Sequence, residues 1–545
     1  MTVTVLKSAF ADIDIPSVDI ATFLFASAQQ HDALARSEAP RPLFVAETDD
    51  APESLTLAQM EAFSSELASG LHHAAGVRRG DVVAVVMPNT IYYLGVVLAA
   101  TMAGAACAPA NPAYTARELH HQLCDSGATH VITTAALYPL VCEAAGCGAH
   151  TVRGALVIDR QPPAPGALPV CSVFDVLSAA PYPRMTLRTA DECASTMALL
   201  LYSSGTTGAP KGVMLSHRNL VVNTLQTKAA AGDVNTGTLL AIVPMFHSFG
   251  MTFQCLLGPC RGLSTVVMER FGMARFMQLV DAHQVTDTIL APPIVNALVK
   301  LPAADFSTRF NLGSLQRAVV GAAPIGPSTI ALLEQRLPQL RILQGYGMTE
   351  ASPAVSLNPP ATRKADSVGA LLPNIDAKVI DDEGRLLGPG ARGELCFRGP
   401  NIMMGYLGRP DATRDTIDED GFIHTGDIGH IDADTHVYVT DRKKELIKYN
   451  GFQVAPAELE ALLMQHPSVR DCAVAGVFDD VRQTEVPRAY LVLNPDVDAL
   501  TAAPEVVAWL NSQVAHFKQL RGGFVLLDAI PKNPSGKILR RLLGH

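Results

Sequence analysis

The segment Ser203–Gly212 reads SSGTTGAPKG and directly follows an apolar run, Met197–Tyr202. Such an apolar run predicts a buried strand. The small residues after it let backbone N–H groups approach a polyanion closely, while the hydroxyls and the ammonium group of Lys211 add donors and a countercharge. The segment therefore predicts a phosphate-binding loop at the end of a strand.

This loop differs from the Walker loop of other nucleotide-binding proteins. Lys211 is followed by glycine instead of Ser or Thr, and the glycines are spaced differently. A flexible turn is also rich in Gly, Ser and Thr, but it rarely combines this order of hydroxyls with a lysine directly after a strand. We therefore interpret the segment as a phosphate cradle of another class.

The sequence on either side of the loop indicates the fold class. Short β-branched runs such as Val82–Val86 and Val131–Thr134 alternate with helix-like segments such as Glu118–Ser126. This order is typical of α/β proteins with largely parallel sheets. From about Asp376, short strands separated by turns such as Gly388-Pro389-Gly390 indicate an antiparallel subdomain. We expect an α/β fold whose large N-terminal domain holds two α/β sheet subdomains and a small β subdomain.

A second domain is expected after the charged segment Asp441–Glu445, which reads DRKKE. This segment separates the strand-like run Val437–Thr440 from a new α/β pattern, and domain boundaries commonly fall in polar segments of this kind. We therefore expect a large N-terminal domain at residues 1–440 and a small, mobile α+β C-terminal lid at residues 441–545.

Charge and cysteine usage argue against two classes of partner. The chain has 42 basic and 52 acidic side chains, a formal charge of −10 and no long basic run, so we expect no nucleic-acid partner. Its 10 cysteines are scattered without CxxC pairs or nearby His ligands, which indicates thiols in a reducing compartment instead of a zinc site.

Targeting signals are also missing from the sequence. The N-terminus lacks the basic start and apolar core of a signal peptide, and the C-terminal LRRLLGH is not an SKL-type peroxisomal signal. The most apolar stretch, Ile91–Ala108, is rich in Ala and Gly and runs into Pro109, which favours a buried helix and strand over a membrane span. We expect a cytoplasmic protein without a transmembrane segment.

Five further motif-like segments follow the loop in order along the chain. The segments are Gln344–Glu350 (QGYGMTE), His424–Asp427 (HTGD), Asp441–Glu445 (DRKKE), Gly451–Val454 (GFQV) and Pro534–Lys537 (PSGK). Together with the loop, they resemble the signatures of the adenylate-forming superfamily, which comprises acyl-CoA synthetases, luciferases and peptide-synthetase adenylation domains. The segment Ala110–Thr115 (ANPAYT) extends the resemblance, which covers essentially the whole chain, towards the 4-coumarate:CoA ligase branch.

The resemblance implies an ATP-dependent acid:CoA ligase that uses ATP, Mg²⁺ and CoA. A carboxylate is a poor acyl donor because its leaving group would be oxide, so such enzymes first attach AMP and release pyrophosphate. They then pass the acyl group to the CoA thiol. The expected substrate is an aryl-propenoic or medium-chain carboxylic acid. The expected partners are these small molecules, and the chain is expected to be a monomer or a weak dimer.

The resemblance assigns most motif residues to the nucleotide. Lys537 resembles the catalytic lysine that bridges the acid and the α-phosphate. Thr206 and Glu350 resemble the residues that place Mg²⁺ on the phosphates, a cation that prefers oxygen ligands. Asp427 resembles the ribose acceptor, with Arg442 as a second sugar contact. The predicted ATP and AMP contacts are Ser203, Ser204, Gly205, Thr206, Thr207, Gly208, Lys211, Gln344, Gly345, Tyr346, Thr349, Asp427, Arg442 and Lys537.

For the thioester step, the resemblance implies that the lid rotates at a hinge near Arg442. Lys448 and Gln453 match positions that 4-coumarate:CoA ligases use for catalysis. Asn450 departs from the pattern, because plant ligases and luciferases usually carry Lys there. The predicted CoA contacts are Arg270, Asn450 and Gly451.

The acyl pocket is expected near His247, which lies in the segment Pro244–Gly250 (PMFHSFG) and resembles the family's gate to that pocket. We count His247 among the catalytic residues. Plant coumarate enzymes tend to have Tyr and Ser where Phe249 and Phe253 stand, so an apolar acyl tail is expected. The predicted acyl contacts are His247, Phe249, Phe253, Gly321, Ala322, Gly345, Gly347, Pro353 and Leu357.

Other functions stay open at this point. One alternative is a stand-alone adenylating enzyme that passes the acyl group to a carrier protein. A second is a luciferase-like oxygenase, against which Asn450 counts. A third is a nucleotide-binding protein without activity, which would be expected to carry a broken motif, and none of the motifs is broken.

Overall fold

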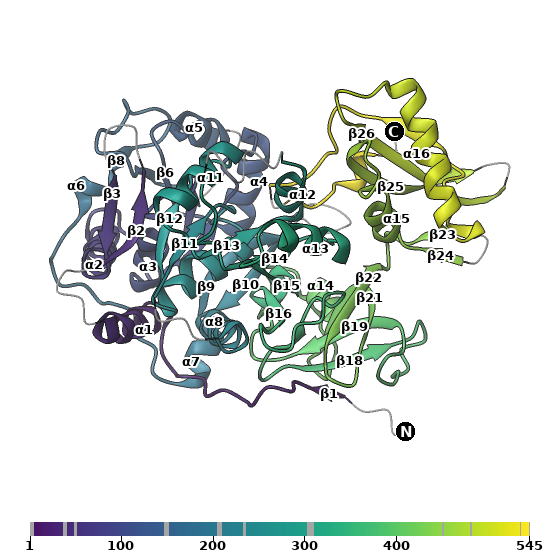
Figure 1. Ribbon diagram of the computed structural model, residues 1–545. Helices are drawn as coiled ribbons and strands as arrows, with labels where there is room; N and C mark the ends of the chain where they lie inside the picture. The colour runs from purple at the N-terminus through teal and green to yellow at the C-terminus, as the bar shows by residue number, and fades with distance from the viewer. Residues whose placement is uncertain are drawn as a thin grey trace.

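The computed structural model describes residues 5–35, 41–47, 52–146, 152–203, 210–232, 236–301, 310–449, 452–479, 482–534 and 536–543. It confirms an α/β protein with a large N-terminal domain and a small C-terminal domain, which is yellow in Figure 1.

One sheet has eight strands within the described residues, in the order β20-β10-β9-β5-β4-β6-β7-β8. Strands β9 to β8 in this order are parallel, whereas β10 and β20 are antiparallel to their neighbours. The strands predicted at Val82–Val86 and Val131–Thr134 are confirmed as β4 and β6. The strands are β4 (Val82–Val86), β5 (Ala106–Pro109), β6 (His130–Thr133), β7 (Gly154–Val157), β8 (Val170–Ser172), β9 (Met197–Ser203), β10 (Lys211–Ser216) and β20 (Gly405–Tyr406).

A second sheet has nine strands in the described part of the chain, in the order β17-β16-β15-β14-β13-β11-β12-β2-β3. Its centre, from β15 to β2, is parallel. The carboxyl ends of these parallel strands meet at one edge, where open α/β sheets bind ligands. The strands are β2 (Pro42–Ala46), β3 (Glu53–Thr56), β11 (Thr238–Ala241), β12 (Ser264–Val267), β13 (Asp287–Leu290), β14 (Arg317–Val320), β15 (Arg341–Gly347), β16 (Ala354–Leu357) and β17 (Ala370–Leu371).

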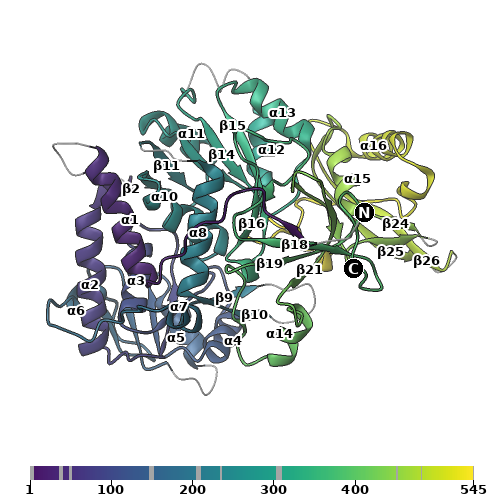
Figure 2. The ribbon, with the colours of Figure 1, turned by 90° about the horizontal axis from the view of Figure 1, so that it is seen from below.

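The predicted antiparallel subdomain is confirmed as a third sheet in the order β1-β18-β19-β21-β22. All of its pairs are antiparallel, and β1 near the N-terminus joins it through β18 (Figure 2). The strands are β1 (Leu6–Lys7), β18 (Asp376–Ile380), β19 (Gly393–Arg398), β21 (Ile423–Ile431) and β22 (Val437–Arg442). Strand β22 continues through Arg442, and the domain boundary at residue 441 stays a prediction.

The C-terminal domain has its own small core, built from apolar side chains such as Leu459, Leu491 and Leu510. It contacts the N-terminal domain beside α12 and α13 (Figure 1), where the ammonium group of Lys300 donates to the carbonyl of Val469 at 2.7 Å. Its elements are the hairpin β23 (Ile447–Tyr449) and β24 (Phe452–Val454), the sheet β25 (Val469–Asp479), β26 (Thr484–Leu493) and β27 (Phe524–Leu526), and the helices α15 (Pro456–Leu463) and α16 (Ala499–Gln513).

Helices cover the sheets, and their starts follow local sequence. At α4, the Thr115 hydroxyl accepts from the Glu118 N–H and the Glu118 carboxylate accepts from the Thr115 N–H, which is a capping box. The main helices of the N-terminal domain are α1 (Ile20–Ala35), α2 (Leu57–His73), α3 (Tyr93–Met102), α4 (Ala116–Ser126), α5 (Tyr138–Gly146), α8 (His217–Ala231), α11 (Met273–Ala282), α12 (Pro292–Lys300) and α13 (Pro327–Arg336). Shorter helices are α6 (Val173–Val176), α7 (Ala190–Ser195), α9 (Ser248–Gly250), α10 (Leu257–Cys260) and α14 (Pro410–Thr416), with a π-helix at Met251–Leu256 and 3₁₀ turns at Thr349–Ala351, His516–Lys518 and Arg540–Leu542.

The most apolar stretch of the sequence is a buried helix followed by a strand, as expected. All residues of α3 are buried, and β5 follows at Ala106–Pro109. A helix that is apolar on every side belongs in the interior of a large domain. Within the part of the chain that the structure describes, none of the helices has both the length and the apolar character needed to cross a membrane.

Candidate active site

A loop of the C-terminal domain carries Lys537 towards the N-terminal domain. Gly536 has a φ of +86°, and a Cβ atom on it would lie 3.2 Å from the Pro293 ring at the start of α12. Glycine therefore allows both the backbone turn and the close approach of the two domains. The Asn533 side chain accepts a hydrogen bond from the Lys537 N–H at 2.8 Å, which fixes the backbone from which the lysine projects.

The Lys537 ammonium group lies among charged groups from both domains. Burial and the positive charge of Arg442 lower the pKa of Lys537 to about 8, although the carboxylates of Glu445 and Asp427 act to raise it. A buried ammonium group that is short of negative charge is stabilised by an anion. The loop therefore presents a cation suited to an anionic ligand.

The Asp427 carboxylate contacts two donors, one on the neighbouring strand β22 and one on β15. Asp427 on β21 lies directly opposite Arg442 on β22, and the Arg442 Nε is 3.2 Å from Asp427 Oδ1. The Tyr346 hydroxyl donates to Asp427 Oδ2 at 2.5 Å. Burial raises the pKa of Asp427, while the charge of Arg442 acts to lower it. Ribose hydroxyls would have to join or replace these donors at the carboxylate.

His247 lies close enough to Lys537 to be affected by its charge. Burial, with a contribution from the Lys537 ammonium group, lowers the pKa of His247 to about 4, so the ring is neutral at pH 7. Its Nδ1 accepts a hydrogen bond from the Phe249 N–H at 3.3 Å. The proton of the neutral ring therefore lies on Nε2, where it can be donated to an acceptor.

A tyrosine that the sequence analysis did not single out connects two predicted nucleotide residues. The Tyr406 hydroxyl donates to Glu350 Oε1 at 2.9 Å, and the Lys211 ammonium group lies 4.7 Å from the centroid of the Tyr406 ring. The pairing of β20 with β10 brings Tyr406 to Lys211, opposite Val213. That contact joins distant segments, and no local sequence signal marks it.

The other predicted nucleotide residues lie along β15 and the strand before the loop. Ser203 ends β9 directly opposite Lys211 on β10. The Gln344 side chain is buried and donates to the carbonyl of Ala365 at 2.9 Å, so its amide supports the neighbouring loop. The Thr349 hydroxyl is 3.4 Å from that of Ser248. The loop residues Ser204, Gly205, Thr206, Thr207 and Gly208 lie outside the described residues.

Two aromatic rings form one wall of the predicted acyl pocket. Phe249 and Phe253 are buried, and their ring centroids are 5.1 Å apart in an edge-to-face arrangement. Phe253 lies on the π-helix Met251–Leu256. A Cβ atom on Gly321 would lie 3.5 Å from the Phe249 ring, so this glycine leaves space beside it. A cavity of about 20 Å³, roughly the volume of one water molecule, is lined by Phe253 together with Arg261, Asp287 and Arg317, and by none of the other predicted acyl residues.

The remaining acyl positions lie at the end of β15 and around it. Gly345 is paired with the fully buried Leu357. A Cβ atom on Gly347 would lie 1.9 Å from the carbonyl oxygen of Pro353, so only glycine fits there. Ala322 has a φ of +71°. The structure therefore gathers the predicted acyl residues around β14, β15 and the Phe249 segment.

The described residues predicted for the thioester step are exposed, two on the C-terminal domain and one, Arg270, on the N-terminal domain between β12 and α11. Lys448 and Gln453 face each other across the β23–β24 hairpin, and both are exposed. Arg270 is also exposed, with its Nε 3.9 Å from the Glu269 carboxylate. Asn450 and Gly451 lie outside the described residues. In this conformation Lys537 is half-buried, whereas Lys448 and Gln453 of the hairpin are exposed to solvent.

Comparison with known proteins identifies the family. The sequence pattern of AMP-binding enzymes matches residues 30–407, and that of their C-terminal domain matches residues 458–537. The chain belongs to the family of AMP-binding enzymes. This AMP-binding enzyme is 38% identical to 4-coumarate-CoA ligase 1 of Narcissus pseudonarcissus, over 90% of this chain and 88% of the relative. It is 39% identical to 4-coumarate-CoA ligase 5 of Oryza sativa subsp. japonica, over 90% of this chain and 89% of the relative.

Solved structures of the family share the fold of this enzyme. The crystal structure of ATP-bound MatB from Rhodopseudomonas palustris has a TM-score of 0.80 at 28% identity, over 95% of this chain and 97% of that chain. The o-succinylbenzoate CoA synthetase of Bacillus subtilis, in complex with its acyl-adenylate intermediate, has a TM-score of 0.77 at 25% identity, over 95% and 97% of the two chains. The prediction of an adenylate-forming fold is confirmed.

Proposed function

We propose that this AMP-binding enzyme is an ATP-dependent acid:CoA ligase. It joins a carboxylic acid to AMP, releases pyrophosphate, and then transfers the acyl group to the thiol of CoA. The observation that carries the proposal is the convergence of Lys537 from the C-terminal domain with His247, Asp427 and Arg442 of the N-terminal domain, because the charge of Lys537 affects both His247 and Asp427. The names of the relatives agree with this activity.

In the first half-reaction, Lys537 would neutralise charge at the α-phosphate while the acid carboxylate attacks. The two anions repel each other, so a preorganised cation stabilises the transition state. The neutral His247 ring would donate its Nε2–H to the acid carboxylate or to the phosphate and so orient that group. Because the ring is uncharged, it would not compete with Lys537 for the negative charge. Asp427, supported by Arg442 and Tyr346, would bind the ribose hydroxyls.

Mg²⁺ would be held by Glu350 together with Thr206. A carboxylate oxygen is a hard ligand of the type that Mg²⁺ prefers, so Glu350 fits this role. The hydroxyl of Tyr406 donates to one Glu350 oxygen at 2.9 Å and would orient the carboxylate for the ion. When bound, the ion supplies positive charge to the phosphates, and Lys211 would add to that charge from the neighbouring strand.

In the second half-reaction, Lys448 and Gln453 would act on the acyl-adenylate after the lid, residues 441–545, has rotated near Arg442. Lys448 and Gln453 are exposed while Lys537 is half-buried, which supports such a division of labour. A cavity of about 390 Å³ separates part of the C-terminal domain, including Met464, from α12 and α13. Incomplete packing between the two bodies is compatible with their movement. Arg270, Asn450 and Gly451 would contact CoA.

The preferred acid is proposed to be an aryl-propenoic acid without a ring hydroxyl, or a medium-chain aliphatic acid. Phe249 and Phe253 offer aromatic surface and no hydrogen-bonding group at their ring edges. A phenol hydroxyl buried against them would lose its hydrogen bonds to water, at a cost of about 1–3 kcal/mol. The bulk of the Phe253 ring would shorten the pocket, so very long chains should fit poorly.

The test is incubation of the enzyme with ATP, Mg²⁺, CoA and a panel of cinnamate, 4-coumarate, hexanoate, octanoate and palmitate. We expect AMP and acyl-CoA in equal amounts. AMP release with acyl transfer to a carrier protein but not to CoA would favour the stand-alone adenylating enzyme. Light emission or oxygen uptake would favour the oxygenase. Absence of AMP release with every acid would refute the proposed function.

A further inference from the structure

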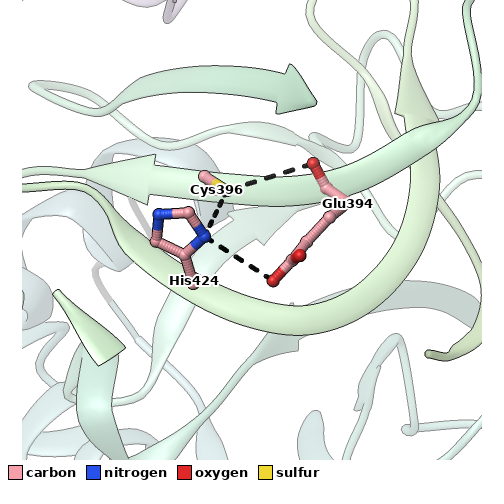
Figure 3. A group of neighbouring side chains, drawn as sticks. All are labelled: Glu394, Cys396 and His424. Atoms are coloured by element: carbon pink, nitrogen blue, oxygen red, sulfur yellow. Dashed lines mark hydrogen bonds and ion pairs between the residues drawn. The ribbon is translucent and has the colours of Figure 1, made fainter. Parts of the chain in front are cut away.

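Three potential metal-binding side chains meet on one face of the antiparallel sheet. Glu394 and Cys396 are two residues apart on β19, so their side chains lie on the same face of the strand. His424 on β21 is the direct cross-strand partner of Cys396. In Figure 3, dashed lines join one imidazole nitrogen of His424 to the Cys396 thiol and to the Glu394 carboxylate.

The spacing of the three side chains suits a small metal ion. His424 Nδ1 is 3.7 Å from Cys396 Sγ and 3.8 Å from Glu394 Oε1, and the three ligand atoms lie within 4.8 Å of one another. Ligand atoms about 2.0–2.3 Å from a tetrahedral ion lie about 3.3–3.8 Å apart. Small side-chain rotations would therefore bring all three atoms to bonding distance of one ion.

A carboxylate behind the histidine sets the orientation of its ring. His424 Nε2 is 3.3 Å from Asp418 Oδ2, and Asp418 in turn accepts hydrogen bonds from the Lys378 ammonium group at 2.6 Å and the Phe422 N–H at 2.8 Å. Burial acts to raise the pKa of Asp418, but these hydrogen bonds lower it below its ordinary value, so the group is an acceptor. In the neutral ring Nε2 therefore carries the proton, and Nδ1 has a free lone pair that accepts from the Cys396 thiol and could bind an ion. Metal-binding histidines typically have a carboxylate or carbonyl partner of this kind.

We propose that Glu394, Cys396 and His424 form a binding site for one divalent ion of the zinc class, with water as the fourth ligand. Thiolate and imidazole ligands select Zn²⁺, Co²⁺ or Cd²⁺ over Mg²⁺. The thiolate and the Glu394 carboxylate balance the charge of the ion. The site is separate from the proposed Mg²⁺ position at Glu350 and does not depend on the proposed function. Because 28 residues separate Cys396 from His424, the spacing of metal motifs does not reveal it.

Protons and lysines compete with the ion for these ligands. A metal ion binds the Cys396 thiolate, so the thiol proton must be released as the metal–sulfur bond forms. Lys443 lies 3.5 Å from Glu394 Oε2, and the charge of Lys378 also reaches Cys396, while Asp418 adds negative charge nearby.

A second cysteine–histidine pair provides the matched control. Cys124 Sγ is 3.6 Å from His120 Nε2 on the surface of α4. This pair offers a thiol and an imidazole to the same ions. The group of Glu394, Cys396 and His424 differs because it adds a carboxylate ligand. Among the residues that the structure describes, it is the one group of three His, Cys, Asp or Glu side chains close enough together to hold a metal ion.

The experiment is a titration of the chelator-treated full-length enzyme with Co²⁺, followed by absorption spectroscopy. We expect a thiolate-to-cobalt charge-transfer band that saturates at one equivalent, is abolished by Zn²⁺ and persists in excess Mg²⁺. Cys396→Ser should abolish the band, and Glu394→Gln should weaken binding by about tenfold or more. Cys124→Ser should leave the band unchanged.

Folding of each variant is checked by circular dichroism and by its melting temperature. The wild-type titration tests the site even if a variant misfolds, because absence of the charge-transfer band in the wild-type enzyme would overturn the proposal. Loss of the band in Cys124→Ser, or its retention in folded Cys396→Ser, would place the metal elsewhere and overturn it as well.

Discussion

Replacement of Lys537 by Ala is expected to impair only the first half-reaction. Burial and the charge of Arg442 lower the pKa of Lys537 to about 8, so about nine tenths of the side chains carry a proton at pH 7. The ammonium group is therefore available to the α-phosphate in the free enzyme. Loss of one such preorganised contact costs about 3–4 kcal/mol, or about 10²–10³-fold in the rate of adenylate formation.

The same pKa predicts a pH dependence. As the pH rises through about 8, Lys537 loses its proton and its charge, so kcat/KM for adenylate formation should fall on the basic side of the profile. Lys537→Arg keeps the charge at all accessible pH values, because a guanidinium group does not lose its proton there. This variant should be slower than the wild type but should lack the basic limb.

Two separate assays measure these effects. Pyrophosphate release reports adenylate formation, and acyl-CoA production from supplied acyl-adenylate reports the second step. Lys532→Ala is the matched control, because Lys532 lies near Lys537 in the chain but pairs with Asp471 of its own domain at 2.6 Å. It should leave both steps nearly unchanged. An equal loss in both half-reactions of Lys537→Ala, or a basic limb that persists in Lys537→Arg, would refute the reasoning.

The remaining predictions concern the second step, the Mg²⁺ position and the acyl pocket. Lys448→Ala and Gln453→Ala should slow thioester formation from supplied acyl-adenylate by about tenfold or more and should leave pyrophosphate release nearly intact; parallel losses in the two assays would contradict the division of labour. Tyr406→Phe removes one hydrogen bond to the proposed Mg²⁺ ligand Glu350, worth about 1 kcal/mol. KM for Mg-ATP should therefore rise several-fold in steady-state assays, while thioester formation from supplied acyl-adenylate stays unchanged. An unaltered KM would exclude this role of Tyr406. Phe253→Ser should raise the kcat/KM ratio of palmitate to hexanoate by about tenfold, or about 1.4 kcal/mol. A wild-type kcat/KM about tenfold higher for 4-coumarate than for cinnamate would contradict the predicted apolar pocket.

Features that depend on short stretches of sequence could be predicted. The apolar run before the loop becomes β9, and the all-apolar stretch at Ile91–Ala108 becomes a buried helix and a strand. Hydrophobic pattern and turn residues act over a few neighbours, so their outcome is visible in the sequence. The antiparallel sheet after Asp376 follows from the same local signals. The motifs also marked Asp427 and Arg442, which β21 and β22 place opposite each other.

Contacts that depend on strand register could not be predicted. Tyr406 reaches Lys211 because the two-residue strand β20 pairs with β10, and Cys396 meets His424 because of the register between β19 and β21. A shift of one residue would turn these side chains to the opposite face. The edge-to-face packing of Phe253 on Phe249 involves a π-helix, which apolar periodicity does not distinguish from an α-helix.

Charge explains why the two proposed half-reactions occur in succession. Before adenylation, the ATP phosphates and the acid carboxylate would surround Lys537 in the proposed reaction, and their negative charge would offset the burial that lowers its pKa. Release of pyrophosphate removes most of that negative charge and leaves the buried ammonium group beside Arg442. The docked lid would therefore lose electrostatic stabilisation once the adenylate has formed, which would favour the proposed rotation of Lys448 and Gln453 to the acyl group. His247 is neutral above its pKa of about 4, so it adds no positive charge that would oppose either stage.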